Sequence, residues 1–355
     1  MRPQAVPVTV LTGFLGSGKT TLINRILKEA HGRRFAVIEN EYGEINVDAD
    51  LLVKDGGETV VQLTNGCVCC TVRGDLANAL NDLASKRDKG EIEFDHVLIE
   101  PTGLADPGPI VRTFMAETEV LGKYFLDGVV TLFDAVNGER NLAESVEAQA
   151  QLAYADRVLV TKVDLLGGPG FSPTAEPASR PEGRPTDAAD ELVARVSALN
   201  TMAGVASVDT HRAPWDEVFE KLLELRGYQF DRVVFAPQAS DAQGGTHTRG
   251  VGSISFNAET PLDGVQLNRA LAAINERYGE ALWRIKGVLA IDGMRNRIIV
   301  QGVQGLIQAN PSTVWRMFEP KLSRLVLIGR ELDRDWVLGL LQGCVSAATN
   351  APPEH

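Results

Sequence analysis

The chain has 355 residues, of which 44% are hydrophobic and 23% charged, the composition of a globular protein long enough for two domains. Its formal net charge of −12 argues against binding to nucleic acids or anionic membrane surfaces, because both need basic protein surface. No run approaches the roughly 18 apolar residues of a membrane span, and the first residues show no signal-peptide pattern, so we expect a cytoplasmic protein.

The first half of the chain alternates strand patterns with helical patterns. This alternation is typical of an α/β domain whose mostly parallel sheet is flanked by helices. Strands are expected at Val6–Leu11, Phe35–Ile38, Thr59–Leu63, His96–Ile99, Gly128–Phe133 and Arg157–Val160. The helices expected between them are Lys19–Ala30, Arg73–Lys86, Pro107–Ala116 and Val136–Ala153.

The second half of the chain contains an interruption and then a second domain. The segment 167–186 is rich in Pro, Gly and Ser and is predicted to be a disordered insertion, because a helix at Ala188–Leu199 and a strand at Val205–Val208 follow it. Farther on, a helix at Leu262–Tyr278 and a last helix at Asp333–Cys344, among the strand-like runs VGSISF, LWRIKGVLAI, NRIIVQGV and RLVLIGR, predict a small α/β domain. The expected boundaries are 1–213 for the first domain, 214–250 for a connecting helix and linker, 251–346 for the second domain and 347–355 for a disordered tail.

The clearest motif is a phosphate-binding loop. GFLGSGKTT, from Gly13 to Thr21, fits G-x-x-x-x-G-K-[ST] between a predicted strand and a predicted helix, which predicts a P-loop NTPase. Its glycines let backbone N–H groups surround phosphate oxygens, and the helix N-terminus adds positive potential. Lys19 is expected to reach the β- and γ-phosphates, and the Thr20 hydroxyl to bind Mg²⁺. The residues expected to bind the nucleotide here are Gly13, Gly16, Ser17, Gly18, Lys19, Thr20 and Thr21.

Two later segments indicate which nucleotide is bound and how it is hydrolysed. In TKVD, Thr161–Asp164, the position of Asp164 suits an acceptor for guanine N1 and the exocyclic amine, and the stem of Lys162 would cover the ring. Thr161, Lys162 and Asp164 therefore predict GTP rather than ATP. Glu100 ends a buried strand and is expected to hold the Mg²⁺ shell or orient the attacking water, with a cap for the following turn as the alternative. Gly103 is expected to offer a backbone N–H to the γ-phosphate. The expected catalytic residues are Lys19, Glu100 and Gly103.

A cluster of cysteines predicts a metal site. The chain has four cysteines, and three of them lie within four residues, at Cys67, Cys69 and Cys70. In a reducing cytoplasm such a cluster is more typical of a metal site than of a disulfide. Thiolates suit Zn²⁺ best, with Co²⁺ and Ni²⁺ as competitors in vitro. The remaining cysteine, Cys344, is expected to pack in a core at the end of the last helix.

An acidic segment between the P-loop and Glu100 is expected to complete this metal site. The segment Glu39–Asp48, ENEYGEINVD, lies where nucleotide state is normally sensed. A carboxylate from Glu39, Glu41 or Glu44 could join the thiolates, because two or three thiolates alone leave a tetrahedral site incomplete. Asp48, at the end of the segment, is expected to contact the nucleotide.

Other interpretations of these residues stay open. The three cysteines could be buried apolar residues, or they could form a redox switch through a disulfide. The protein could then be a metal sensor or store that is indifferent to GTP, or a GTPase regulated by thiol oxidation. A P-loop kinase that phosphorylates a small molecule is a further alternative, which the Thr161–Asp164 element argues against.

Taken together, the motifs resemble those of the CobW-type GTPases, which are associated with metallocofactor assembly and zinc homeostasis. The segments that carry the resemblance are TGFLGSGKTT, AVIENEYGEINVD, LTNGCVCC, IEPTGLADPGPI and YADRVLVTKVD, followed by RIKGVLAIDG, VQGV and LVLIGREL. The resemblance implies a GTPase domain with a C-x-C-C metal site and a CobW-like C-terminal domain. It also implies metal binding coupled to GTP binding, and delivery of the metal to a client metalloprotein.

Two further expectations concern hydrolysis and partners. The sequence offers no identifiable intrinsic arginine finger, so GTP hydrolysis is expected to be slow and stimulated by a partner. The client is expected to bind through the C-terminal domain, and the sequence leaves open whether the chain also forms a homodimer.

Overall fold

The computed structural model describes residues 5–29, 33–39, 52–54, 58–62, 72–166, 185–210, 212–225 and 251–346. Contacts divide the chain into two compact units, Met1–Tyr228 and Gln229–His355. Most of the predicted insertion at 167–186 lies outside the described residues, although Pro185 and Thr186 begin a helix. The linker residues 226–250 and the predicted tail 347–355 also lie outside them.

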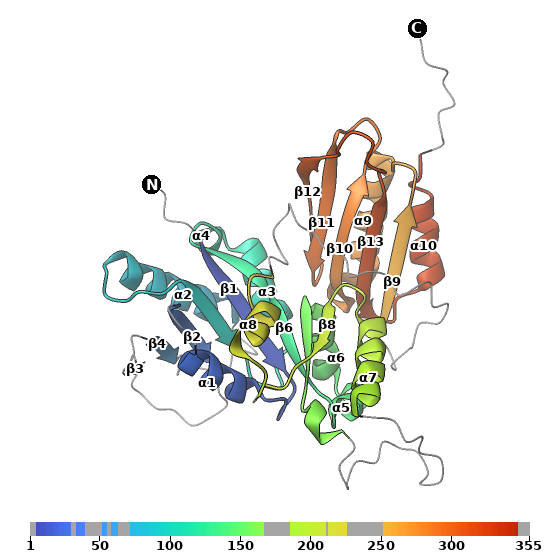
Figure 1. Cartoon of the computed structure of the whole chain (residues 1–355). Coiled ribbons are helices and arrows are strands. Elements are labelled where there is room, and N and C mark those ends of the chain that lie inside the picture. The colour runs from blue at the N-terminus through green and yellow to red at the C-terminus, as the bar shows by residue number, and fades with distance from the viewer. Residues whose placement is uncertain are drawn as a thin grey trace, which may run out of the picture. The chain divides into compact units, whose positions relative to one another are not determined.

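The first unit is built on one twisted sheet of strands β1 to β8, most of which are labelled in Figure 1. Its strands run in the order β3-β4-β2-β5-β1-β6-β7-β8, and every described pairing is parallel except that of β3 with β4. The predicted mostly parallel sheet is therefore confirmed. The strands are β1 (Val6–Gly13), β2 (Phe35–Glu39), β3 (Leu52–Lys54), β4 (Glu58–Gln62), β5 (His96–Glu100), β6 (Tyr124–Asp134), β7 (Arg157–Thr161) and β8 (Gly204–Ser207).

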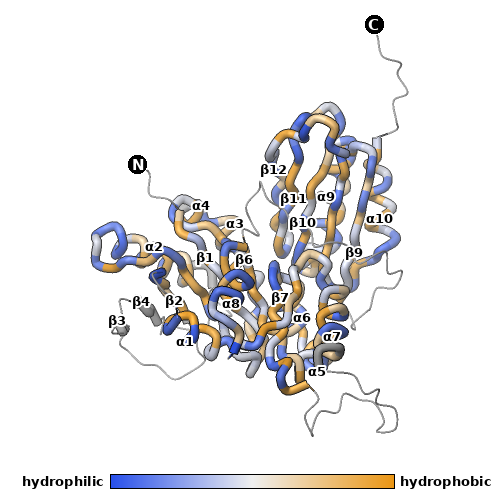
Figure 2. The backbone as a smooth tube through the Cα atoms, viewed as in Figure 1, coloured by the Kyte–Doolittle hydropathy of each residue, from blue (hydrophilic) through white to orange (hydrophobic). Residues whose placement is uncertain are grey.

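Helices cover both faces of this sheet, because its strands are apolar on both sides. In β7, for example, Leu159 belongs to a core with side chains of α1 and α8, whereas Val158 and Val160 belong to a core with side chains of α6 and α7. Hydrophobic residues recur along these strands in Figure 2. No helix in the described ranges is long and apolar enough to cross a membrane. The helices of this unit are α1 (Lys19–Glu29), α2 (Val72–Asp88), α3 (Gly108–Ala116), α4 (Thr118–Leu121), α5 (Gly138–Glu144), α6 (Val146–Tyr154), η1 (Val163–Leu165), α7 (Pro185–Leu199) and α8 (Trp215–Leu222).

Strand β3 and helix α4 were not predicted from the sequence, and two further elements of the first unit have other bounds than predicted. The single helix expected at Val136–Ala153 is two helices, α5 and α6, because Ser145 is extended and its Oγ accepts a hydrogen bond from the Ala148 N–H. An N-cap of this kind begins a new helix. Strand β6 begins at Tyr124 rather than Gly128, and its pairing with β1 shifts register near Asp127. The sequence Leu126-Asp127-Gly128 has the composition of a turn, but in the structure Asp127 is an extra residue at an irregularity within a longer strand.

The second unit is an antiparallel sheet whose strands run in the order β12-β11-β10-β13-β9. Side chains of α9 and α10 join those of the sheet in one apolar core, which includes Cys344, so the predicted packing role of this cysteine is confirmed. Burial raises the pKa of the Cys344 thiol. The elements are β9 (Val251–Ala258), α9 (Gly264–Tyr278), η2 (Gly279–Ala281), β10 (Leu282–Ala290), β11 (Asn296–Val303), β12 (Leu306–Val314), β13 (Ser323–Arg330) and α10 (Arg334–Gln342).

Strand β12 was missed by the sequence prediction. It is an edge strand that carries Pro311 and several polar residues, which weakens its strand pattern. It is joined to β11 by a two-residue turn, Gln304–Gly305, in which both residues have positive φ, 45° and 78°. Two positive φ values favour a tight hairpin turn of this kind, and Gly305 adopts such a conformation without strain.

Candidate functional site

The P-loop lies between β1 and α1, at the carboxyl edge of the central strand. Gly13, the last residue of β1, has φ of 145°, and a Cβ added there would lie 2.6 Å from the carbonyl oxygen of Leu132 and 2.7 Å from Ser17 Oγ. Gly16 and Gly18 also have positive φ, at 77° and 101°. These conformations are readily accessible only to glycine, so the sequence dictates the sharp turn of the loop.

Polar side chains of the P-loop, those of Ser17 and Lys19, are buried. The Lys19 ammonium donates hydrogen bonds to the carbonyl oxygens of Gly13 at 2.9 Å and Phe14 at 3.4 Å. Burial lowers the pKa of Lys19 below its usual value, and the nearby Glu100 carboxylate raises it in part. Ser17 Oγ is buried, and no described residue forms a hydrogen bond with it. A donor set of this kind at a helix N-terminus suits a phosphate anion.

Thr20 and Glu100 bring two oxygen ligands together beside this loop. The Thr20 hydroxyl, in the first turn of α1, donates a hydrogen bond to Glu100 Oε1 at 3.3 Å. Glu100 is the last residue of β5, which pairs directly with β1. A hydroxyl and a carboxylate are hard ligands of the type that Mg²⁺ prefers. These residues therefore fit the predicted magnesium site.

The loop after β5 lies against the P-loop through Gly103. A Cβ added to Gly103 would lie 2.7 Å from Leu15 Cδ2 and 2.9 Å from the Leu15 nitrogen, so only glycine fits at this contact. On its other side the loop is held by Gln151 of α6, whose Nε2 donates to the carbonyl oxygens of Gly103 and Ala105, both at 3.1 Å. The sequence prediction identified Gly103 but missed Gln151.

The T-K-x-D element is also anchored to the P-loop. Thr161, at the end of β7, is buried, and its hydroxyl donates to the carbonyl oxygen of Ser17 at 2.9 Å. Lys162 adopts a left-handed conformation with φ of 59°, and its ammonium contacts Asp134 Oδ2 at 2.7 Å. Asp164 lies in η1 with an exposed side chain.

Asp134 is a functional candidate that the sequence prediction missed. It ends β6 directly beside Thr161 in the neighbouring strand, and its carboxylate also accepts hydrogen bonds from the backbone N–H groups of Val136 and Asn137. Burial alone would raise the pKa of Asp134, but the hydrogen bond from Lys162 and those from Asn137 and the backbone outweigh it, so the pKa lies below its usual value. The charged carboxylate therefore stays paired with Lys162.

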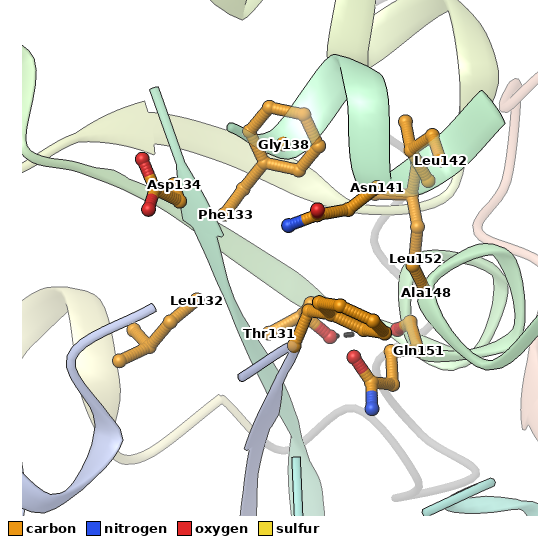
Figure 3. Close-up of a pocket in the computed structure, with 11 residues that line it drawn as sticks. Thr131, Leu132, Phe133, Asp134, Gly138, Asn141, Leu142, Ala148, Gln151 and Leu152 are labelled. Atoms are coloured by element: carbon orange, nitrogen blue, oxygen red, sulfur yellow. Dashed lines mark hydrogen bonds between the residues drawn. The ribbon is translucent and has the colours of Figure 1, made fainter. Parts of the chain in front are cut away.

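A small pocket lies behind the P-loop, between β6 and the helices α5 and α6 (Figure 3). Asp134 and Gln151 both line it, together with apolar side chains such as Leu142 and Leu152. Its volume is about 20 Å³, whereas sites for small organic ligands usually measure several hundred cubic ångströms. The pocket is therefore too small for a guanine base.

The predicted metal ligands lie at the same sheet edge or outside the described residues. Glu39, whose backbone ends β2, pairs with Glu100 of β5 on one side and Gln62 of β4 on the other. The predicted ligands Cys67, Cys69, Cys70 and Glu44, and the predicted nucleotide contact Asp48, lie outside the described residues. Among the residues that the structure does describe, no three His, Cys, Asp or Glu side chains are grouped as a metal site.

The structure thus gathers most of the described site residues along one edge of the sheet. The P-loop, Glu100, Gly103, Thr161 and Lys162 are connected by direct contacts, as expected for the carboxyl ends of parallel strands. Their individual roles in binding and hydrolysis stay predictions. The signal that could have revealed Asp134 is its position as the last residue of a buried strand, next to the strand that ends in Thr161.

The parallel sheet and this loop define a P-loop nucleotide-binding domain. Residues 7–172 match the CobW/HypB/UreG nucleotide-binding domain, and residues 251–345 match the cobalamin synthesis protein CobW C-terminal domain. The zinc chaperone YjiA of Escherichia coli is 37% identical to this chain over 338 residues, which cover 95% of this chain and 98% of that protein. The zinc chaperone CobW of Pseudomonas aeruginosa is 31% identical, over 93% of this chain and 88% of that protein.

A comparison with solved structures also finds similarity to a zinc-binding member of this family. The crystal structure of Zn(II)-bound YjiA GTPase from E. coli matches with a TM-score of 0.75 and 34% identity, covering 97% of this chain and 100% of that one. The chain belongs to the CobW/HypB/UreG family of GTPases and carries the CobW C-terminal domain. The family predicted from the sequence motifs is therefore confirmed.

Proposed function

We propose that this protein is a GTPase that couples GTP binding and slow hydrolysis to the loading of Zn²⁺ and its delivery to a client metalloprotein. Two relatives are named zinc chaperones, YjiA and CobW, and these names support Zn²⁺ as the metal that the protein would carry. Cys67, Cys69 and Cys70 would bind the ion with a carboxylate from Glu39 or Glu44, since thiolates with one harder ligand suit Zn²⁺.

The observation that carries this proposal is the pairing of Glu39 with both Glu100 and Gln62 at the ends of three neighbouring strands. Neighbouring strands lie about 4.8 Å apart, so the segment after β2 begins next to the strand that carries Glu100, and the loop after β4 begins one strand farther away. Cys67 follows Gln62 by five residues, which span at most about 18 Å. The cysteine loop therefore begins roughly 10 Å from the strand that carries Glu100, a distance that its five residues could span, so a change in nucleotide state could reach it.

The chain's own residues divide the chemistry among them. The P-loop amides and the Lys19 ammonium would bind the phosphates, and Asp164 would select guanine. Mg²⁺, held by the Thr20 hydroxyl with Glu100 in its shell, would neutralise charge on the β- and γ-phosphates. Glu100 would also orient the attacking water, and the Gly103 N–H would sense the γ-phosphate. Loss of that phosphate would release the Glu39–Asp48 segment and weaken the zinc site.

The client is proposed to bind the second unit, where exposed apolar side chains gather at one loop. Between β12 and β13, Met317 is 84% exposed and Phe318 is 96% exposed. The loop is fixed from behind, because Arg297 stacks on Trp315 at 4.6 Å and forms an ion pair with Glu319. Exposed apolar side chains on a fixed loop are a feature of protein interaction sites.

A single-turnover experiment tests the coupling. Zinc-loaded protein is mixed with GTP and Mg²⁺ in the presence of a chromophoric chelator, and phosphate and zinc release are followed together. The proposal predicts that zinc release follows phosphate release at the same rate, and that a Glu100→Gln variant slows both. Zinc release at an unchanged rate with a non-hydrolysable GTP analogue would contradict the proposal.

A further inference from the structure

Gln151 is placed to control the loop that carries Gly103. It lies in the middle of α6, its side chain is 1% exposed, and Nε2 has two hydrogens, one for the carbonyl oxygen of Gly103 and one for that of Ala105. The two acceptors lie 48 and 46 positions away in the sequence. One amide therefore fixes two peptide groups of a loop that belongs to a distant part of the chain.

The backbone of Gln151 is anchored as firmly as its side chain. Its carbonyl oxygen accepts a hydrogen bond from the buried hydroxyl of Thr131, in β6, at 2.7 Å (Figure 3). The loop itself has little freedom on its opposite side, because Gly103 packs directly on Leu15 of the P-loop. Gly103 is therefore held between the P-loop and α6, whereas the next residue, Leu104, is 53% exposed.

The amide oxygen of Gln151 indicates that a contribution to fold stability is not enough to explain why a glutamine occupies this position. Gln151 Oε1 is buried, and no residue in the described ranges donates a hydrogen bond to it. A buried polar atom without a partner destabilises the folded state, and an apolar side chain of the same size would avoid that cost. What a glutamine provides here, and an apolar side chain would not, is the two hydrogen bonds that it donates to the loop.

We infer that Gln151 is a positioning residue that holds the Gly103 N–H where a γ-phosphate can accept its hydrogen bond, and so sets the preference for GTP over GDP. This inference rests on the proposed function, which gives Gly103 its contact with the γ-phosphate. GDP lacks that phosphate, so its binding does not depend on where the loop lies. Losing the amide should therefore weaken binding of the triphosphate selectively.

Two glutamines of the same helix provide a matched test. Gln149 is also buried in α6, but its Nε2 donates to the carbonyl oxygen of Leu142 in α5, away from the loop. The variants Gln151→Met and Gln149→Met each remove a buried amide at nearly constant side-chain volume. Affinities for GDP and for a non-hydrolysable GTP analogue are measured with Mg²⁺ by displacement of a fluorescent nucleotide, and melting temperatures are recorded in parallel.

The expected result is a loss of about tenfold in analogue affinity in Gln151→Met, with GDP affinity within twofold of the wild type. Gln149→Met should keep both affinities within twofold, whatever its melting temperature. A Gln151→Met protein that melts cooperatively and keeps the wild-type ratio of the two affinities overturns the inference. If that variant does not fold, Gln151→Asn, whose amide is one methylene too short to reach the loop, is judged by the same criterion. A wild-type protein that binds neither guanine nucleotide would instead overturn the proposed function.

Discussion

Replacing Asp134 by Asn tests how the T-K-x-D element is held in place. The Asp134 carboxylate is 4% exposed and contacts the Lys162 ammonium, which is 33% exposed, at 2.7 Å. Asn keeps the size of the side chain and an oxygen for the N–H groups of Val136 and Asn137, so the change chiefly removes the charge opposite Lys162. Lys162 then loses the partner of its ammonium group, so its side chain should be less restrained in the position where its stem is predicted to cover the base.

The expected magnitude follows from this partly buried geometry. A hydrogen bond to a charged group contributes about 1.5–3 kcal/mol, and exposure of one partner reduces that toward 1 kcal/mol. A loss of about 1–2 kcal/mol in GDP binding corresponds to roughly a 5- to 30-fold weaker affinity. Because the pKa of Asp134 lies below its usual value, the charge opposite Lys162 persists at mildly acidic pH. The difference in GDP affinity between the wild type and the Asp134→Asn variant should therefore be the same at about pH 7 and pH 5. It should shrink only as the pH falls through the lowered pKa of Asp134.

Calorimetric titration with GDP at these two pH values is the assay. The matched control is Glu139→Gln, which breaks an ion pair with Arg195 at 2.8 Å whose two side chains are both more than half exposed. Exposed pairs contribute little, so the control should bind GDP within about twofold of the wild type. Asp134→Asn protein that binds GDP as tightly as Glu139→Gln protein would refute this reasoning.

Two further substitutions probe the sheet beneath the site. Gly13→Ala should lower the free energy of unfolding by about 2–5 kcal/mol, since the new Cβ meets Leu132 O at 2.6 Å and φ is 145°. Gly90→Ala, with φ of 73° but open space, should cost only about 1 kcal/mol, and equal losses in urea unfolding would contradict the packing argument. Burial, with a smaller effect of Arg33, lowers the pKa of His96 to about 3. Between roughly pH 6.5 and 3, the unfolded chain therefore binds a proton at His96 that the folded chain does not. In that window the free energy of unfolding should fall by about 1.4 kcal/mol for each unit that the pH decreases. His96→Gln should reduce the slope by about this amount in urea unfolding between pH 6 and 4, and an unchanged slope would show that His96 does not contribute to it.

The parts of the fold that the sequence predicts are those fixed by short-range pattern. The P-loop is defined by glycines whose positive φ values other residues avoid, and the central strands are recognisable because both of their faces are apolar. Strand β12 was not predicted because an edge strand tolerates Pro311 and polar residues, which weaken the strand pattern. The break at Ser145 escaped because an N-cap inside a continuous helical pattern resembles an ordinary polar position.

The missing parts of the site depend on long-range contacts. Asp134 and Lys162 are 28 positions apart, and Gln151 and Gly103 are 48 apart, so no local pattern connects them. Sequence spacing does place Thr161 and Glu100 at the ends of strands, and the parallel sheet then brings those ends to one edge. The residues that hold these loops in position become visible only when the helices are packed against the sheet.

The most direct test of the central claim is the affinity for Zn²⁺ in the two nucleotide states. It is measured by competition with a chromophoric chelator, with GDP and then with a non-hydrolysable GTP analogue, for the wild type and for a Cys67→Ala/Cys69→Ala variant. A nucleotide can shift metal binding only through its difference in affinity for the two metal states. The account predicts tighter zinc binding with the GTP analogue, and loss of that difference in the variant. Equal zinc affinity with both nucleotides in the wild type would contradict it.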